Sequence, residues 1–293
     1  MFPQRRLRRL RRTPALRRMV AETLLTPDDL IAPLFVREGI TEPQPIASLP
    51  GVVQHTRASL EEEVGELIDL GIPAVILFGV PERKDPEGSG ASDPDGIVQV
   101  ALRDLRDAYG DDIVLMADLC LDEYTDHGHC GLVTPAGTVD NDATLDRYAE
   151  VAVVQAQAGV DVVAPSGMMD GQVAAIRDAL DDEEFDQVAI MAYAAKYASG
   201  LYGPFRDAVD VEIAGGGDRK AYQQDFRNAR EALEEVRADV NEGADILMVK
   251  PALSYLDVLV RVRAEHDLPL AAYHVSGEYA MIKASARAGV IDE

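Results

Sequence analysis

Short apolar runs and longer amphipathic stretches alternate along this chain from about residue 30 onward. The apolar runs have the length of β-strands, and polar residues rarely interrupt them. Nearly continuous apolar character is typical of strands that are covered on both faces, as in a parallel sheet. The sequence predicts seven such strands: Leu30–Val36, Ala74–Gly79, Ile113–Cys120, Val160–Ser166, Gln187–Tyr193, Ala244–Lys250 and Pro269–Ser276.

Between these runs, and after the last one, apolar residues recur every three or four positions, which is typical of amphipathic helices. The expected helices are Leu60–Leu70, Ile97–Tyr109, Ala143–Ala158, Asp170–Leu180, Tyr222–Glu242, Tyr255–His266 and Glu278–Ala288. Alternating strands and helices predict an α/β fold with a parallel sheet, and their number favours a TIM-type (β/α)8 barrel. An open doubly wound sheet is the alternative, although no glycine-rich dinucleotide motif follows an early strand.

The chain contains seven strand–helix units, whereas a closed barrel of this type contains eight. After the last expected helix the sequence ends at Glu293, so we expect the eighth strand and helix to be missing at the C-terminus. The first and seventh strands would then have open edges, which favour aggregation or pairing with a borrowed strand. We therefore expect the native product to extend beyond Glu293.

The first eighteen residues contain eight arginines and no acidic residue. They lack the apolar region of a secretory signal. Such a segment could be a nucleic-acid tail, a transit peptide, an oligomerisation arm or a disordered solvated tail. Because the rest of the chain is strongly acidic, we expect the arm to dock on a neighbouring copy. The sequence thus predicts a basic oligomerisation arm over residues 1–25 and a catalytic barrel domain, incomplete at its C-terminus, over residues 26–293.

The whole chain is acidic, with 52 Asp and Glu against 28 Lys and Arg and a formal charge of −24. Its surface would repel phosphates, which argues against general nucleic-acid binding. No apolar run approaches the roughly 18 residues that span a bilayer, so we expect no membrane span. Cys120 and Cys130 form no disulfide framework, which predicts a reducing, cytoplasmic location. The acid-rich, lysine-poor composition also suggests adaptation to high salt.

Only five lysines occur, and two of them follow apolar runs closely. Near a buried strand end a lysine loses hydration, which lowers its pKa and leaves a neutral amine that can form a Schiff base with a ketone. Two lysines whose charged ends reach solvent are the alternative interpretation. In a barrel, chemistry occurs at the C-terminal ends of the strands, so residues at these ends favour an enzyme. These residues are Cys120, Ser166, Lys196, Lys250 and Ser276.

The third predicted strand ends in a cluster of metal-ligand residues. Cys120 and Asp122 lie two apart on a strand-like segment and can share a face, and Cys130 returns from the following loop. Thiolates and carboxylates both bind zinc, and three protein ligands with one open position describe a catalytic site. A buried cysteine beside a solvated loop is the alternative. We expect His127 and His129 to shape the loop or relay protons rather than to bind the metal.

The segment after Lys196 has the features of a lid that carries anion-binding groups. Its glycine triplet, residues 215–217, suits a loop that closes over a substrate. Arg206 and Arg219 suit a carboxylate, because a guanidinium binds this group through paired hydrogen bonds. Solvated surface arginines are the alternative interpretation.

Several motifs make the chain resemble the porphobilinogen synthase (5-aminolaevulinate dehydratase) family over essentially its whole length. They are Tyr202–Asp207 (YGPFRD), Leu247–Pro251 (LMVKP), Ala164–Ser166 (APS), Val139–Asp142 (VDND) and Val275–Glu278 (VSGE). The resemblance implies a TIM barrel with an N-terminal arm that embraces a neighbouring subunit, usually within a homo-octamer. It also implies condensation of two 5-aminolaevulinate molecules to porphobilinogen with loss of water, an early step of tetrapyrrole (haem) biosynthesis.

The resemblance further implies a role for each matching residue. Lys250 would hold the first substrate as a Schiff base at the P site, and Lys196 would hold the second at the A site. Glu235 would bind an allosteric magnesium ion between subunits. The residues implied in carboxylate binding or in lining the reaction chamber are Arg206, Arg219 and Gln223 (A-site carboxylate), Ser276 (P-site carboxylate), and Asp118, Ser166 and Tyr202 (chamber).

The sequence departs from the family pattern in two places. Zinc-type members carry cysteine at all three cluster positions, whereas here Asp122 stands between Cys120 and Cys130. Two soft thiolates still favour zinc over magnesium, although the affinity should fall. Family members also continue for about one further strand and helix, which supply a tyrosine to the P-site carboxylate. The alternatives are a non-catalytic truncated assembly subunit and another Schiff-base class I aldolase, which would need only one lysine.

Overall fold

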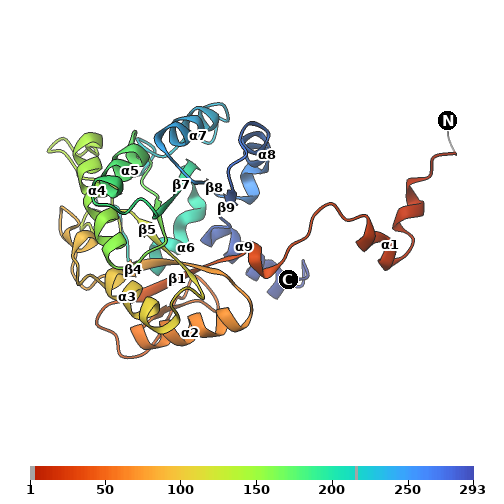
Figure 1. Ribbon diagram of the computed structural model, residues 1–293, viewed down its shortest axis with the longest axis horizontal. Helices are drawn as coiled ribbons and strands as arrows, with labels where there is room; N and C mark the ends of the chain where they lie inside the picture. Colours follow the sequence, from red (N-terminus) through yellow and green to blue (C-terminus); the bar gives the residue numbers. More distant parts are fainter. Residues whose placement is uncertain (1–3, 215–216) are drawn as a thin grey trace.

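Seven parallel strands run through the centre of the molecule in chain order (Figure 1). The structure is a computed structural model that describes residues 4–214 and 217–293. Each strand pairs in parallel with its sequence neighbour, which confirms the predicted alternation. These strands are β1 (Ile31–Arg37), β4 (Ala74–Val80), β5 (Val114–Leu119), β6 (Val162–Pro165), β7 (Ala189–Lys196), β8 (Ile246–Lys250) and β9 (Leu270–Ala272).

Two short strands, which the sequence did not predict, extend the sheet beyond β1. Strand β3 (Val53–His55) pairs in parallel with β1, and β2 (Gln44–Pro45) pairs antiparallel with β3. They are too short and too polar to produce an apolar run. The sheet order is β2-β3-β1-β4-β5-β6-β7-β8-β9, and within the described ranges no pairing joins β9 to β1. The layout is that of a TIM-type barrel whose ladder is not closed at this position.

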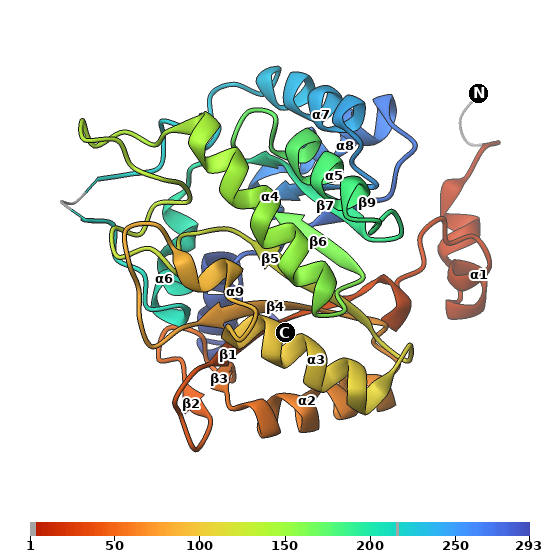
Figure 2. The ribbon, with the colours of Figure 1, turned by 60° about the vertical axis from the view of Figure 1, so that its left-hand side comes forward.

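The helices are α1 (Pro14–Met19), α2 (Arg57–Asp69), α3 (Ile97–Tyr109), α4 (Asn141–Gln157), α5 (Gln172–Asp182), α6 (Gly203–Ala208), α7 (Glu231–Glu242), α8 (Leu256–Glu265) and α9 (Ser276–Arg287). Helices α2 to α5, α7 and α8 pack on the outside of this sheet (Figure 2). Helix α1 belongs to the N-terminal arm, and α6 and α9 pack against the inward-facing core. Short 3₁₀ segments are η1 (Leu7–Arg11), η2 (Pro27–Asp29), η3 (Ser89–Ser92), η4 (Gly200–Tyr202) and η6 (Leu253–Tyr255).

The expected helix Tyr222–Glu242 is wrong in its first part, because α7 begins only at Glu231. The preceding residues pair with the end of β7 instead. The Gln224 N–H donates to the Lys196 carbonyl, and the Ala198 N–H donates to the Gln224 carbonyl. These backbone groups therefore extend β7 and are not free for helical hydrogen bonds. The last predicted strand is likewise shorter than expected, since α9 already begins at Ser276.

Side chains of the central strands alternate between two apolar cores, as the pleat of a strand requires. The outward-facing set, which includes Leu77, Leu115 and Val163, packs against the helices. The inward-facing set fills the interior, and each fully buried large side chain contributes about 1.5–3 kcal/mol. Inward-facing residues include Phe35, Ile76, Phe78, Met116, Tyr193 and Met248.

The N-terminal arm stands away from the rest of the molecule in both views (Figure 1 and Figure 2). Its segments η1 and α1 bury no residue, although Thr13 caps α1 by accepting a hydrogen bond from the Leu16 N–H. Leu24 and Leu25 are 83% and 77% exposed. The arm therefore presents apolar side chains without a partner surface in its own chain. Among the described residues, no helix is both long and apolar enough to cross a membrane.

Candidate functional site

The two predicted lysines lie side by side at the C-terminal ends of β7 and β8. Lys196 and Lys250 are register partners in this parallel pair. Each lysine is only 5% exposed, so both amines are buried. The alternative of two lysines that reach solvent is therefore wrong for this structure.

An irregularity in β7 turns Lys196 toward the interior. Met191 and Tyr193 face inward, but Ala194 and Ala195 both belong to the outer core. The register with β8 shifts between Ala192 and Ala195, as expected for a β-bulge. Regular alternation after Tyr193 would have pointed Lys196 outward. The bulge thus places both amines in one interior space.

The Lys250 amine lies among aromatic rings. Its Nζ is 3.9 Å from the ring centroid of Tyr273, 4.8 Å from that of Tyr193 and 5.3 Å from that of Phe205. Burial, followed by the nearby Lys196 cation, lowers the pKa of Lys250 to about 7. A substantial fraction of this amine is therefore neutral and nucleophilic near neutral pH.

A polar chain from β5 and β6 reaches the Lys196 amine. The Lys196 Nζ donates to the Ser166 carbonyl. The Ser166 hydroxyl donates to Asp118 Oδ2 at 3.1 Å. Burial raises the pKa of Asp118 to about 6, although the Lys196 and Lys250 cations oppose this shift. Asp118 can therefore hold or release a proton beside both lysines at physiological pH.

One cavity of about 460 Å³ contains both lysines. The residues expected from the sequence that line this cavity are Asp118, Asp122, Ser166, Lys196, Tyr202, Arg206, Arg219, Gln223 and Lys250. The Tyr202 hydroxyl donates to the Tyr197 carbonyl at 2.7 Å and to the Lys250 carbonyl at 3.3 Å, so it ties the segment after β7 to the end of β8. The structure therefore brings residues from five separate segments together.

Donors for an anion gather on the lid side of this cavity. Arg219 Nε and Gln223 Nε2 are buried and have no hydrogen-bond partner among the described residues. Arg206 lines the same cavity from α6. Two glycines of the predicted lid, Gly215 and Gly216, lie outside the described residues.

A second cavity of about 640 Å³ meets the first at Lys250, Tyr202 and Phe205. Ser276 lines this second cavity at the start of α9. Its hydroxyl accepts a hydrogen bond from the Phe205 N–H at 2.9 Å and donates to the Leu201 carbonyl. The two lysines and the predicted substrate-binding residues thus divide between two cavities that share Lys250.

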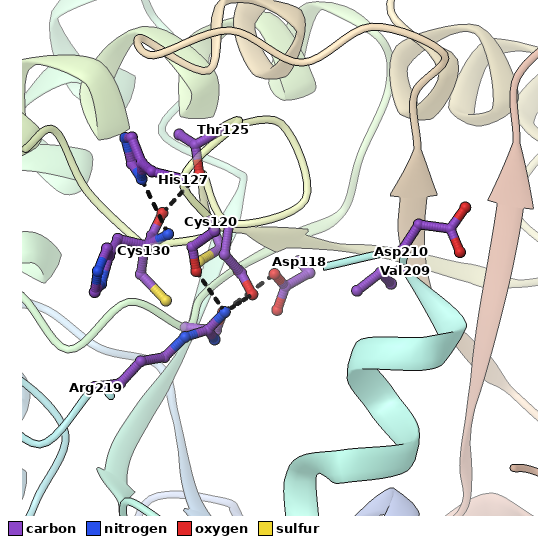
Figure 3. A network of polar contacts seen from close by, with 12 residues as sticks. Asp118, Cys120, Thr125, His127, Cys130, Val209, Asp210 and Arg219 are labelled. Atoms are coloured by element: carbon purple, nitrogen blue, oxygen red, sulfur yellow. Dashed lines mark hydrogen bonds and ion pairs between the residues drawn. The ribbon is translucent and has the colours of Figure 1, made fainter. Parts of the chain in front are cut away.

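Cys120, Asp122 and Cys130 come together as a buried cluster. Figure 3 shows Cys120 and Cys130 beside Arg219. One ligand atom from each lies within 4.8 Å of the other two. A hydrogen bond with Cys120 lowers the pKa of the Cys130 thiol. Burial favours the neutral form of Asp122, but Arg219 and Lys196 outweigh it and hold the pKa of this carboxyl well below its usual range. Two sulfurs and an ionised carboxylate fit a zinc ion.

Arg219 and Asp122, for which the sequence suggested separate partners, form an ion pair. Arg219 Nη2 lies 2.7 Å from Asp122 Oδ2, and both side chains are largely buried. The same Nη2 donates to the Gly128 carbonyl at 2.8 Å. Arg219 therefore contacts the loop between Cys120 and Cys130 directly.

Glu235 lies apart from both cavities, on α7. Burial, followed by the charge of Asp170, raises its pKa. Asp239, one helical turn further on, has its pKa raised to about 8 by burial and by Glu242. These acids form a half-buried acidic region on the outside of the sheet.

The sequence matches known proteins over its whole length. A family model described as "Delta-aminolevulinic acid dehydratase" matches residues 4–293. The chain belongs to this family. The Streptomyces coelicolor delta-aminolevulinic acid dehydratase is 60% identical over 99% of this chain and 88% of its own length. The Mycobacterium leprae protein of the same name is 57% identical over 100% of this chain and 89% of its own.

A solved structure of the same family matches the fold closely. It is the delta-aminolevulinic acid dehydratase (porphobilinogen synthase) of Toxoplasma gondii ME49 in complex with the reaction product porphobilinogen. The TM-score is 0.97 at 46% identity, and the match covers 100% of this chain and 84% of that chain. The family resemblance and the TIM-type fold inferred from the sequence are thus confirmed.

Sequence reasoning missed four residues that border the site of this dehydratase family member. Glu123 lines the first cavity, and neither of its carboxylate oxygens has a hydrogen-bond partner within the described residues. Tyr193 and Tyr273 surround Lys250. The sequence did contain signals for three of them. Tyr193 and Tyr273 lie in predicted strands whose ends form the site, and Glu123 follows the predicted ligand Asp122. Tyr148 on α4 contacts the cysteine loop but belongs to no motif, so nothing in the sequence indicated it.

Proposed function

We propose that this protein is a porphobilinogen synthase, a hydro-lyase that condenses two 5-aminolaevulinate molecules to porphobilinogen with loss of two water molecules. The observation that carries this proposal is the pair of buried lysines, Lys196 and Lys250, aligned on adjacent strands and lining one cavity. One Schiff base would need one lysine, whereas a condensation that activates two ketones needs two. Membership of the dehydratase family supports the same reaction.

The first covalent step is Schiff-base formation at Lys250. Its neutral amine attacks the ketone of one substrate, and the carbonyl oxygen leaves as water. The aromatic rings around Nζ exclude water that would hydrolyse the imine. Ser276 lines the adjoining cavity, and its hydroxyl would donate to the carboxylate of this substrate by giving up its hydrogen bond to the Leu201 carbonyl.

The second substrate binds Lys196 in the same way, with Arg206, Arg219 and Gln223 around its carboxylate. Loss of a proton from the carbon beside the Lys196 imine gives an enamine, which attacks the Lys250 imine carbon and forms the carbon–carbon bond. Asp118 is close to both amines and can accept and return protons. The free amine of the substrate on Lys250 then attacks the Lys196 imine carbon, closes the ring and displaces the Lys196 amine. Elimination of the Lys250 amine, with loss of ring protons, releases the pyrrole.

Cys120, Asp122 and Cys130 are the residues that would hold a catalytic zinc ion. Bound there, zinc would act as a Lewis acid near Lys196 and stabilise negative charge that develops on oxygen. We expect a chelator to abolish porphobilinogen formation and zinc to restore it. Restoration by magnesium alone would reassign the metal, and full activity in rigorously metal-free protein would refute the metal requirement.

The arm and the acidic region around Glu235 support an oligomer with allosteric magnesium. The exposed Leu24 and Leu25 need a partner surface, which a second copy would provide. We infer a homo-oligomer, an octamer in line with the family resemblance, that works in the cytoplasm, where both cysteines stay reduced. Removing residues 1–25 should lower the native mass measured by light scattering, and Glu235→Gln should remove the response of activity to magnesium.

Trapping with borohydride and 5-aminolaevulinate, followed by peptide mass spectrometry, tests the reaction directly. Adducts are expected on both Lys196 and Lys250 and not on the exposed Lys220, which serves as an internal control. An adduct on one site lysine alone, with other carbonyl compounds turned over, would favour a class I aldolase. If neither lysine forms an adduct, the result would favour a non-catalytic assembly subunit.

A further inference from the structure

The Asp122 carboxylate has two candidate partners, the Arg219 guanidinium and a metal ion at the cysteine cluster. It lies 2.7 Å from Arg219 Nη2, and the two side chains are 4% and 11% exposed. The same carboxylate belongs to the three-residue cluster with Cys120 and Cys130. A guanidinium and a metal ion are both cations, so each weakens the hold of the other on this one anion.

Arg219 also faces two partners. One side of its guanidinium contacts Asp122 and the Gly128 carbonyl. Its Nε is buried without a hydrogen-bond partner in the described part of the chain, as is the neighbouring Gln223 Nε2. Both groups line the cavity that contains Lys196. A carboxylate entering there would compete with Asp122 for this cation.

We propose that Arg219 exchanges Asp122 for the substrate carboxylate, so that binding of the second substrate releases Asp122 to the metal and tightens metal binding. This coupling rests on the proposed function, because it needs a substrate carboxylate at Arg219 and a metal at the cysteine cluster. A thiolate in place of Asp122 could not form the same carboxylate–guanidinium pair. The exchange is therefore a consequence of the Cys–Asp–Cys ligand set of this chain.

Thermodynamic linkage makes the coupling reciprocal. If the substrate carboxylate raises zinc affinity by some factor, zinc raises affinity for that carboxylate by the same factor. For a buried ion pair that must break before the ligand binds fully, we expect a factor of about ten, within the usual range of such couplings.

The test uses the full chain with 4-oxopentanoate, which keeps the ketone and carboxylate of 5-aminolaevulinate but lacks the amine that closes the ring. Zinc affinity is measured by competition with a chromophoric chelator, with and without this probe. Zinc should bind about tenfold more tightly with the probe present, and the probe should bind more tightly with zinc by an equal factor. In Asp122→Cys, zinc should bind more tightly overall. The ratio of zinc affinity with the probe to zinc affinity without it should fall toward one.

Borohydride trapping of the probe on Lys196 separates the two proposals. If the adduct forms and zinc binds, but zinc affinity is the same with and without the probe, the coupling is overturned and the proposed function stands. A ratio that persists unchanged in Asp122→Cys also overturns it, because the probe then acts without Asp122. Absence of both the adduct and zinc binding overturns the coupling together with the proposed function.

Discussion

Lys250, the proposed Schiff-base lysine, illustrates how a buried titratable side chain can weaken the fold that holds it. Folding lowers its pKa from 10.5 to about 7, so between these values the unfolded chain binds a proton that the folded chain does not. By linkage, the lysine costs stability most below pH 7, and this cost shrinks as the pH rises toward 10.5. A side chain that does not ionise would not lower the free energy of unfolding in this way.

Replacing Lys250 with methionine should therefore abolish activity and stabilise the protein. We expect a gain of about 2–4 kcal/mol at pH 7 in the free energy of unfolding, measured in urea, and a smaller gain at pH 9.5. Lys220→Met, at a side chain that is 73% exposed, is the control and should change little. An equal gain at both pH values would contradict the assignment of a lowered pKa.

Tyr148, on α4, contacts both cysteines of the proposed metal site. Its hydroxyl donates to the Cys130 carbonyl at 2.7 Å and lies 3.9 Å from Cys120 Sγ. Removing a group that orients a metal ligand typically lowers metal affinity by about 10–100-fold. Tyr148→Phe should therefore weaken zinc binding by about tenfold in a chelator competition. Tyr109→Phe is the control. It removes the hydrogen bond from the Tyr109 hydroxyl on α3 to the Glu61 carbonyl on α2, away from the cysteine cluster, and should leave zinc binding unchanged.

At the scale of elements, Glu278 joins the segment after β8 to the start of α9. Its carboxylate is fully buried and accepts hydrogen bonds from the N–H groups of Leu253, Ala252 and Val275. Because Lys250 precedes the first segment and Ser276 begins α9, this carboxylate holds both sides of the second cavity together. An amide in its place would accept fewer of these bonds and would lose the charge that strengthens them.

We expect Glu278→Gln to lower the free energy of unfolding by about 1–3 kcal/mol. Its KM for 5-aminolaevulinate should rise more than its kcat falls, because the proposed carboxylate site beside Ser276 would be less well ordered. Urea unfolding and steady-state kinetics measure the two effects. Asp257→Asn, at a 59% exposed acid on α8, is the matched control. A variant with wild-type stability would show that the three N–H groups find other acceptors.

At the scale of the whole molecule, charge repulsion opposes folding. The formal charge is −24, with 52 acidic residues against 28 basic ones. Salt screens such repulsion, and the Debye length falls from about 10 Å at 0.1 M to about 3 Å at 1 M. We expect the thermal midpoint of unfolding to rise markedly from low salt to molar salt. Sodium and potassium chloride should give equal gains if screening is the cause, and equal midpoints at low and molar salt would refute salt adaptation.

Local pattern was sufficient to predict the alternating elements and most of the cavity. Apolar runs and helical periodicity depend on which face of an element is buried, and this information is present in consecutive residues. Lys250 follows its strand without interruption, so its position at the end of β8 could be read directly. The cysteine cluster was equally accessible, because its ligands lie close together in the sequence.

The tertiary structure alone decided how these parts face one another. The inward direction of Lys196 depends on a bulge within an alanine-rich run, where neither face is marked by polarity. The start of α7 depends on Gln224 pairing with β7. The Arg219–Asp122 pair joins residues far apart in the chain. Side-chain direction, strand pairing and long-range ion pairs are set by contacts between segments that are distant in the chain. A local sequence pattern contains information only on residues that are close together in the chain.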